Sequence, residues 1–130
     1  NLPQLYNYLT VCYYGLNDEE NVIKSIMRTM ELFPDYLFGK IVYAEHLIST
    51  GRHNEIPELF DNKFDVKVLY PEREIFHYSE VLSIYGIAAQ YFYLTGDFEK
   101  SDNYFNSMLR IDPDDYRTIE IGKRIGKKVK

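Results

Sequence analysis

Residues 82–113, LSIYGIAAQYFYLTGDFEKSDNYFNSMLRIDP, decide the fold. The stretch predicts two amphipathic helices joined by a tight turn, because each half carries apolar side chains at helical spacing. Gly96 is expected to end the first helix, since glycine adopts the left-handed C-cap conformation without steric cost. Asp97 is the expected N-cap of the second helix, and Asp112 followed by Pro113 ends it. The stretch therefore predicts a helical hairpin whose facing stripes are Tyr85, Ala88, Ala89 and Phe92 on one helix and Ser101, Phe105 and Met108 on the other.

The same pattern occurs twice more in the chain. A shift from Tyr85 back to Tyr6 superposes the hairpin on a first copy, made by Tyr6, Leu9, Thr10, Tyr13, Asn17, Val22, Ile26, Thr29 and Pro34. A middle copy is made by Lys40, Tyr43, Ala44, Leu47, Gly51, Ile56, Phe60 and Lys63. Asn17, Gly51 and Gly96 fall at the same turn, and all three residue types tolerate a left-handed backbone. A hairpin of this kind cannot bury both faces alone, so the copies are expected to pack in series.

These residues resemble a tetratricopeptide repeat, whose period is about 34 residues. The resemblance covers roughly residues 3 to 113, although Val22 and Ile56 stand where the family usually has a small residue. It implies an all-α fold, a right-handed superhelical array of antiparallel helix hairpins. Three repeats are expected at 3–36, 37–81 and 82–115, followed by a terminal helix at 116–127. The middle repeat is long, with about eleven extra residues within 64–79 relative to that period.

Local signals place the individual helices. We expect helices at 2–15, about 18–33, 38–50, a short one from an Asn54 cap to about Lys63, and 116 to about 126. Pro71, with Glu72 and Glu74 behind it, predicts the start of a long helix that continues to Thr95. The apolar residues from Phe64 to Tyr70 are expected to pack on the body. The terminal helix is expected to cover the last hairpin with Tyr116, Ile119 and Ile125.

Charge and composition restrict the function. The formal net charge is −5, and five of the 15 basic residues, Lys123, Arg124, Lys127, Lys128 and Lys130, are gathered at the C-terminal end. The rest of the chain is acidic, which argues against nucleic-acid binding. No apolar run is long enough for a membrane span, and no signal peptide is visible. The first residue is Asn1, so we expect a fragment of a longer protein. The cytoplasm is slightly favoured as its compartment.

The sequence offers no support for catalysis, a metal or a cofactor. His46, His53 and His77 lack the spacing of metal ligands. Cys12 lies among apolar residues and is expected to pack in the core, as free cysteines usually do. The acidic clusters fall at helix starts, where capping and the helix dipole explain them. We therefore expect a protein that is not an enzyme.

What remains is recognition of another protein. The resemblance implies that the first helix of each hairpin lines a concave face, which here is mostly apolar: Asn7, Val11, Tyr14, Phe38, Ile41, Glu45, Ile48, Gln90 and Tyr93. We expect this face to hold a peptide or helix of unknown identity. The charged residues with which some members of the family clamp the carboxylate end of chaperone tails are absent, so that ligand class is rejected. Two alternatives stay open. One is an architectural spacer or homo-oligomerisation domain, and the other is anion binding through Lys123 to Lys130.

Overall fold

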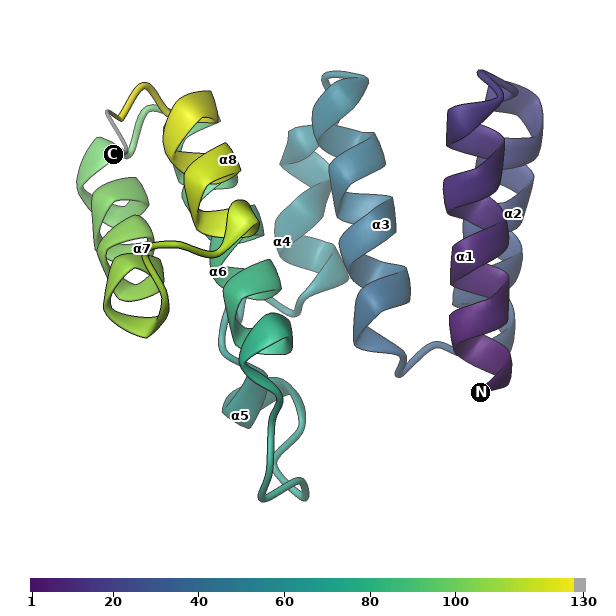
Figure 1. Cartoon of the computed structure of the whole chain (residues 1–130), viewed down its shortest axis with the longest axis horizontal. Helices are drawn as coiled ribbons and strands as arrows, with labels where there is room; N and C mark the ends of the chain where they lie inside the picture. Colours follow the sequence, from purple (N-terminus) through teal and green to yellow (C-terminus); the bar gives the residue numbers. More distant parts are fainter. Residues whose placement is uncertain (128–130) are drawn as a thin grey trace. The chain divides into compact units, whose positions relative to one another are not determined.

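The computed structural model describes residues 1–127, and Lys128 and Lys130 of the basic tail lie outside this range. Within it the chain forms eight α-helices and one short 3-10 helix, packed as helix pairs and without a strand (Figure 1). The all-α prediction is confirmed. The chain divides into two compact units, Asn1–His46 and the part from Leu47 onward, and the division falls within helix α3 (Leu37–Ser49).

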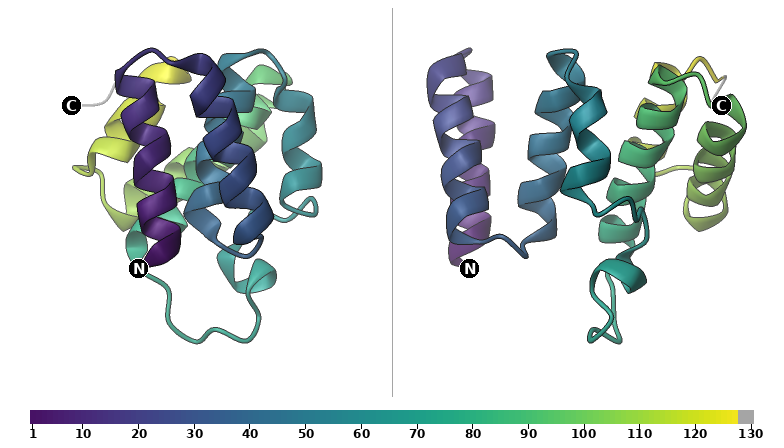
Figure 2. Two further views of the ribbon diagram at one scale, coloured as in Figure 1. Left: turned by 90° about the vertical axis from the view of Figure 1, so that its right-hand side faces the viewer. Right: turned by 180° about the vertical axis from the view of Figure 1, so that it is seen from behind.

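The first unit is built on the hairpin of α1 (Leu2–Gly15) and α2 (Glu19–Leu32). Figure 2 shows these two helices from the side. Its helices begin and end where the sequence predicts. Asp18 caps α2 by accepting a hydrogen bond from the Asn21 amide, and Asn17 takes the left-handed turn conformation at φ 55°. The helices meet through a hydrogen bond between the hydroxyls of Thr10 and Ser25, beside the buried side chains of Val22, Ile26 and Thr29.

The second unit is built on the equivalent hairpin of α6 (Tyr78–Leu94) and α7 (Phe98–Ile111). Gly96 forms the turn at φ 85°, and the Asp97 carboxylate accepts from the Lys100 amide. The Ser101 hydroxyl donates to the Ala89 carbonyl at 2.8 Å, so the two backbones approach closely at small residues. The predicted interface is confirmed, because its small and central members are buried: Ala88, Ala89, Ser101, Phe105 and Met108.

Helix α8 (Tyr116–Arg124) packs on α6 and α7. It ends earlier than the predicted 126–127, because Gly126 turns the backbone left-handed at φ 75°. Tyr116 does not cover the hairpin, since it is 71% exposed, and Ile119 is only half-buried. Ile125 is buried as predicted, and the rest of the covering face is made by Thr118, Ile121 and Gly122, which are also buried.

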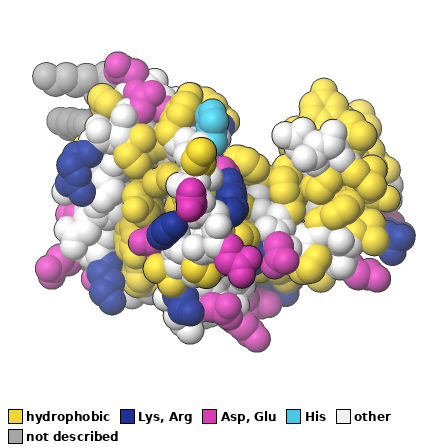
Figure 3. Space-filling model, turned by 90° about the horizontal axis from the view of Figure 1, so that it is seen from below, with side chains coloured by type: hydrophobic (Ala, Val, Ile, Leu, Met, Phe, Trp, Pro, Cys, Tyr) yellow, Lys and Arg dark blue, Asp and Glu magenta, His cyan; other side chains and the backbone are white. Residues whose placement is uncertain are grey.

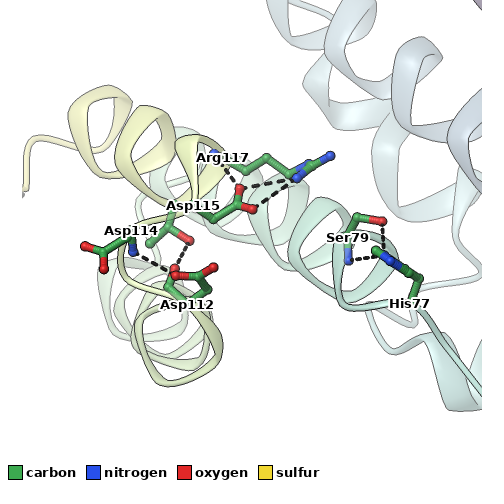
Figure 4. A network of polar contacts seen from close by, with 7 residues as sticks. His77, Ser79, Asp112, Asp114, Asp115 and Arg117 are labelled. Carbon is green, nitrogen blue, oxygen red and sulfur yellow. Dashed lines mark hydrogen bonds and ion pairs between the residues drawn. The ribbon is translucent and has the colours of Figure 1, made fainter.

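The close approach of α8 to α6 depends on Gly86. A methyl group at this position would lie 3.1 Å from the side chain of Ile121. At the start of α8, the Asp115 carboxylate accepts from the Arg117 amide at 2.8 Å and forms an ion pair with its guanidinium (Figure 4). The Thr118 hydroxyl donates to the Asp112 carbonyl. These contacts fix the turn that brings α8 back over the hairpin.

Between α3 and α6 the chain is less helical than expected. It contains the 3-10 helix η1 (His53–Glu55), α4 (Ile56–Leu59) and α5 (Val66–Leu69). Asn54 lies inside η1 and does not act as the predicted cap. Helix α4 ends before Lys63, because Asp61 and Asn62 have φ of 51° and 59° and the Asn62 amide donates back to the Pro57 carbonyl at 2.7 Å.

Helix α6 begins at Tyr78, so the predicted start at Pro71 is wrong. His77 is the N-cap: its ring accepts from the Ser79 amide, while Glu80 accepts from the His77 amide, as Figure 4 shows for His77 and Ser79. Arg73 forms a two-point ion pair with Glu80, each bond 2.8 Å, and lies over the ring of Phe76. The Arg73 guanidinium, helped by the His77 amide, lowers the pKa of the Glu80 carboxyl below its usual 4.5. These bonds hold residues 73–77 outside the helix.

The inserted segment packs on the second unit, as predicted, through Phe64 and Val66, which are both buried. The ring of Phe64 lies 5.7 to 6.1 Å from the rings of Tyr91, Phe92 and Tyr104. Tyr85 in turn lies 5.6 Å from Tyr104. We call these five residues the Phe64 cluster. Burial, together with the nearby charge of Asp65, raises the pKa of both Tyr85 and Tyr104.

Candidate functional site

The residues expected to line a concave face fall in both units, and each unit is described separately. In the first unit, Val11 and Tyr14 of α1 are exposed, and Asn7 is half-buried. The Tyr14 hydroxyl and the His46 Nδ1 are 3.2 Å apart and share a hydrogen bond, which connects α1 to α3. Partial burial, with the negative charges of Glu45 and Glu19, raises the pKa of Tyr14.

Helix α3 carries three more of the expected residues of the first unit. Phe38, Ile41 and Glu45 are all half-buried. The ring of Phe38 lies 6.1 Å from that of Tyr36 in an edge-to-face arrangement. Val11 and Tyr14 of α1 are therefore more accessible than these three residues of α3.

In the second unit, the remaining three expected residues come together. Ile48, Gln90 and Tyr93 line one cavity of about 240 Å³, whose wall is completed by Leu94, Arg124 and Ile125. Ile48 lies at the end of α3, Gln90 and Tyr93 on α6, and Arg124 and Ile125 at the end of α8. The wall is largely apolar, so the cavity is suited to an apolar side chain.

The polar groups of this cavity are held in place. Gln90 is buried; its amide donates to the Gly86 carbonyl at 3.2 Å, and its Oε1 accepts from Arg124 Nη1 at 3.0 Å. Arg124 also forms an ion pair with Glu120 at 3.5 Å. The aromatic wall is fixed by Phe98, whose ring packs edge-on against Tyr93 at 5.5 Å. The cavity thus has a preformed shape and one basic group at its rim.

Sequence reasoning missed Leu94, Arg124 and Ile125 as members of this cavity. Leu94 directly follows Tyr93, so the repeat pattern could have predicted its position. Arg124 and Ile125 join the cavity only because α8 folds back over α6. The sequence gives no signal for that path beyond the apolar spacing of α8, whose register was predicted incorrectly at Tyr116.

The basic tail makes contacts of its own. Lys127 Nζ lies 2.7 Å from the Asp102 carboxylate, and Arg124 is paired with Glu120. These ion pairs neutralise two of the cations that were considered for anion binding. Lys128 and Lys130 lie outside the described residues.

Cys12 is exposed, so the expectation that it packs in the core is wrong. Leu5, Leu9 and Leu16, which share its stripe on α1, are exposed as well. Among residues 1–127, no group of three or more His, Cys, Asp or Glu side chains is arranged to hold a metal ion. In the same range, no helix combines the length and the hydrophobicity needed to cross a bilayer.

The chain was compared with models of known protein families, with curated proteins and with solved structures, and none matches. The fold and the site therefore define the protein as an all-α protein of packed helix pairs, with an apolar cavity beside α6 and α8. The finer resemblance to a tetratricopeptide repeat and the function it implies are proposals.

Proposed function

We propose that this chain is a non-catalytic protein-interaction module of the tetratricopeptide type, with its hairpins arranged in a right-handed array. The proposal for the fold is supported by the two equivalent hairpins α1–α2 and α6–α7. They share the same turn and the same aspartate cap, and in each a hydroxyl hydrogen bond joins the two helices, between Thr10 and Ser25 in one hairpin and from Ser101 to the Ala89 carbonyl in the other.

The observation that carries the proposed function is the cavity in the second unit. Ile48, Gln90 and Tyr93, expected on independent grounds to line a recognition surface, lie together around about 240 Å³ of space. An apolar side chain of a peptide or helix would be anchored there against Tyr93 and Ile125.

A peptide library displayed on phage tests this proposal. Selection on the wild-type chain should enrich peptides with an apolar anchor. Tyr93→Glu should weaken the binding of these peptides about tenfold or more, because a carboxylate would stand in an apolar pocket. Tyr116→Glu is the matched control: the same substitution on an exposed tyrosine of α8 outside the cavity should leave binding unchanged. Peptides that bind both variants equally would show that the cavity is not the recognition site.

Two other functions were considered from the sequence. The architectural alternative receives support from the exposed apolar face of α1. Anion binding is the weaker alternative, because Lys127 and Arg124 are already paired with Asp102 and Glu120. If anion binding were the function, affinity for a vesicle of anionic lipid would fall steeply as salt is added.

A further inference from the structure

Helix α1 presents an apolar stripe that nothing in the first unit covers. Leu2, Leu5, Leu9, Cys12 and Leu16 follow one another at alternating intervals of three and four residues, and all five are exposed. This is the spacing that places side chains on one seam of a helix that packs against another helix. We call these five residues the α1 seam. Figure 3 shows hydrophobic side chains gathered on the visible face of the first unit, at the right.

The equivalent face of α6 is covered. Leu5 and Tyr8 are 64% and 68% exposed, whereas Ile84 and Ile87, their equivalents in α6, are 0% and 1% exposed. Both η1 and α5, the latter in the inserted segment, contact α6, and Phe64 packs on Tyr91, the equivalent of Cys12. The same side of the same hairpin pattern is therefore an interior surface in the second unit and an open one in the first.

The groove beside the α1 seam has a counterpart in the second hairpin, where Phe64 forms part of the wall. Tyr13, Asn21 and Ser25 help to line a groove of about 180 Å³ between α1 and α2. Their equivalents in the second hairpin, Phe92, Lys100 and Tyr104, line a cavity together with Phe64. In the second hairpin the ring of Phe64 lies 5.7 Å from Phe92 and 6.1 Å from Tyr104, and about 330 Å³ of space remains beside it. The groove of the first hairpin is lined by α1 and α2 alone, so it is open to a ring from outside the first unit.

The charges on the hairpin favour one kind of occupant. Residues 2–16 contain no charged side chain. Helices that choose a different partner usually do so through charged residues that flank the seam, and α1 has none. The nearest cations, Lys24 and Arg28 of α2, already pair with Glu20 and Glu31. Two copies of α1 can therefore meet without bringing like charges together.

From these observations we propose that the α1 seam is the contact surface of a homodimer, in which α1 packs against α1 of a second copy. The seam supplies identical apolar knobs to both sides, as an interface around a two-fold axis requires. Tyr8, exposed beside the seam, supplies the ring for the groove of the other copy, in the role that Phe64 has in the second hairpin. This surface shares no residue with the cavity at Tyr93. The homodimer proposal and the ligand-binding proposal can therefore be tested independently.

Sedimentation equilibrium of the whole chain tests the proposal. The wild type should have twice its chain mass of 15.5 kDa. Leu9→Glu should weaken the dimer about 100-fold or more, because each copy would place an unpaired carboxylate in the interface. Val11→Glu puts the same residue on a different side of α1 and should leave the dimer intact. A monomeric wild type, or a dimer that survives Leu9→Glu, would overturn the proposal.

Cross-linking through Cys12 provides a second measurement. It is made on the wild type, so it does not require that Leu9→Glu folds normally. Because helix residues rise about 1.5 Å each, antiparallel α1 helices that cross at Leu9 would place the two Cys12 residues about 9 Å apart along the axis. A bismaleimide of that span should then join two wild-type chains, and Cys12→Ser should abolish the product. Leu5→Glu should also abolish it, with helix content by circular dichroism unchanged. No cross-linked product from the wild type would contradict the assigned interface.

Discussion

The hairpins α1–α2 and α6–α7 share a turn, a cap and a hydroxyl hydrogen bond between their helices, but they differ in what lies on their outer side. In the second hairpin the inserted segment contacts α6 and places Phe64 among its rings, whereas in the first the corresponding side of α1 is exposed. The repeat pattern thus determines how each hairpin packs internally. What covers a hairpin is determined by neighbouring segments that do not follow the pattern.

The largest expected effect is the loss of the ring that covers the second hairpin. Phe64→Ala should lower the free energy of unfolding by about 3–5 kcal/mol, because it leaves a cavity among Tyr91, Phe92 and Tyr104. Urea denaturation measures the change. Ile75→Ala, in the same segment but exposed, should change stability by no more than about 0.5 kcal/mol. Equal effects of the two substitutions would show that Phe64 does not hold the segment.

A smaller effect is expected at the shared turn. Gly96→Ala should destabilise the second hairpin by about 1–2 kcal/mol, because alanine is strained at φ 85°. Asn17→Gly, the reverse kind of change at the equivalent turn, should be neutral or slightly stabilising, since φ is 55° there. Thermal unfolding of both variants compares the two turns directly. A marked loss of stability in Asn17→Gly would mean that the Asn17 side chain has a role beyond its backbone conformation.

The smallest effect concerns the start of α6 and depends on pH. Arg73 lowers the pKa of Glu80 in the folded chain, so this ion pair contributes its full stability above the unfolded value of about 4.5. The contribution is lost as pH falls through the lower folded value. Glu80→Gln should therefore cost about 1 kcal/mol at neutral pH and progressively less below pH ~4.5. Urea denaturation at several pH values measures this, and a cost that does not change with pH would exclude the ion pair as its cause.

Sequence reasoning succeeded where local signals define the structure. Asp18, Asp97, Gly51 and Gly96 mark helix ends through capping and left-handed turns, which involve only neighbouring residues. The bounds of α1, α2, α3 and α7 follow from them within about a residue. The stripe that joins the second hairpin could also be predicted, because helical spacing specifies it. In the first hairpin Leu9 of the predicted stripe is exposed instead.

The errors arose where distant contacts override a local signal. Pro71 and the acids behind it are typical of a helix start, but Arg73 binds Glu80 and holds the chain outside the helix until His77. Cys12 lies on an apolar stripe, and periodicity cannot tell a covered stripe from an open one. Of the residues that line the cavity at Tyr93, only those on α3 and α6 were expected on a recognition face, because the place of Arg124 depends on how α8 folds back.

The Phe64 cluster also gives the second unit a sensitivity to alkali. Tyr85 and Tyr104 keep their protons above the usual pKa of 10.0 while the cluster is intact, and the unfolded chain releases them earlier. Folding stability is therefore expected to fall as the pH rises beyond that value, since unfolding then releases protons. The chain contains no tryptophan, so the ultraviolet absorbance of tyrosinate can follow this change without a label. If the inserted segment opens away from α6, the tyrosinate absorbance of Tyr85 and Tyr104 should rise in one cooperative step, at a pH above the usual pKa of tyrosine.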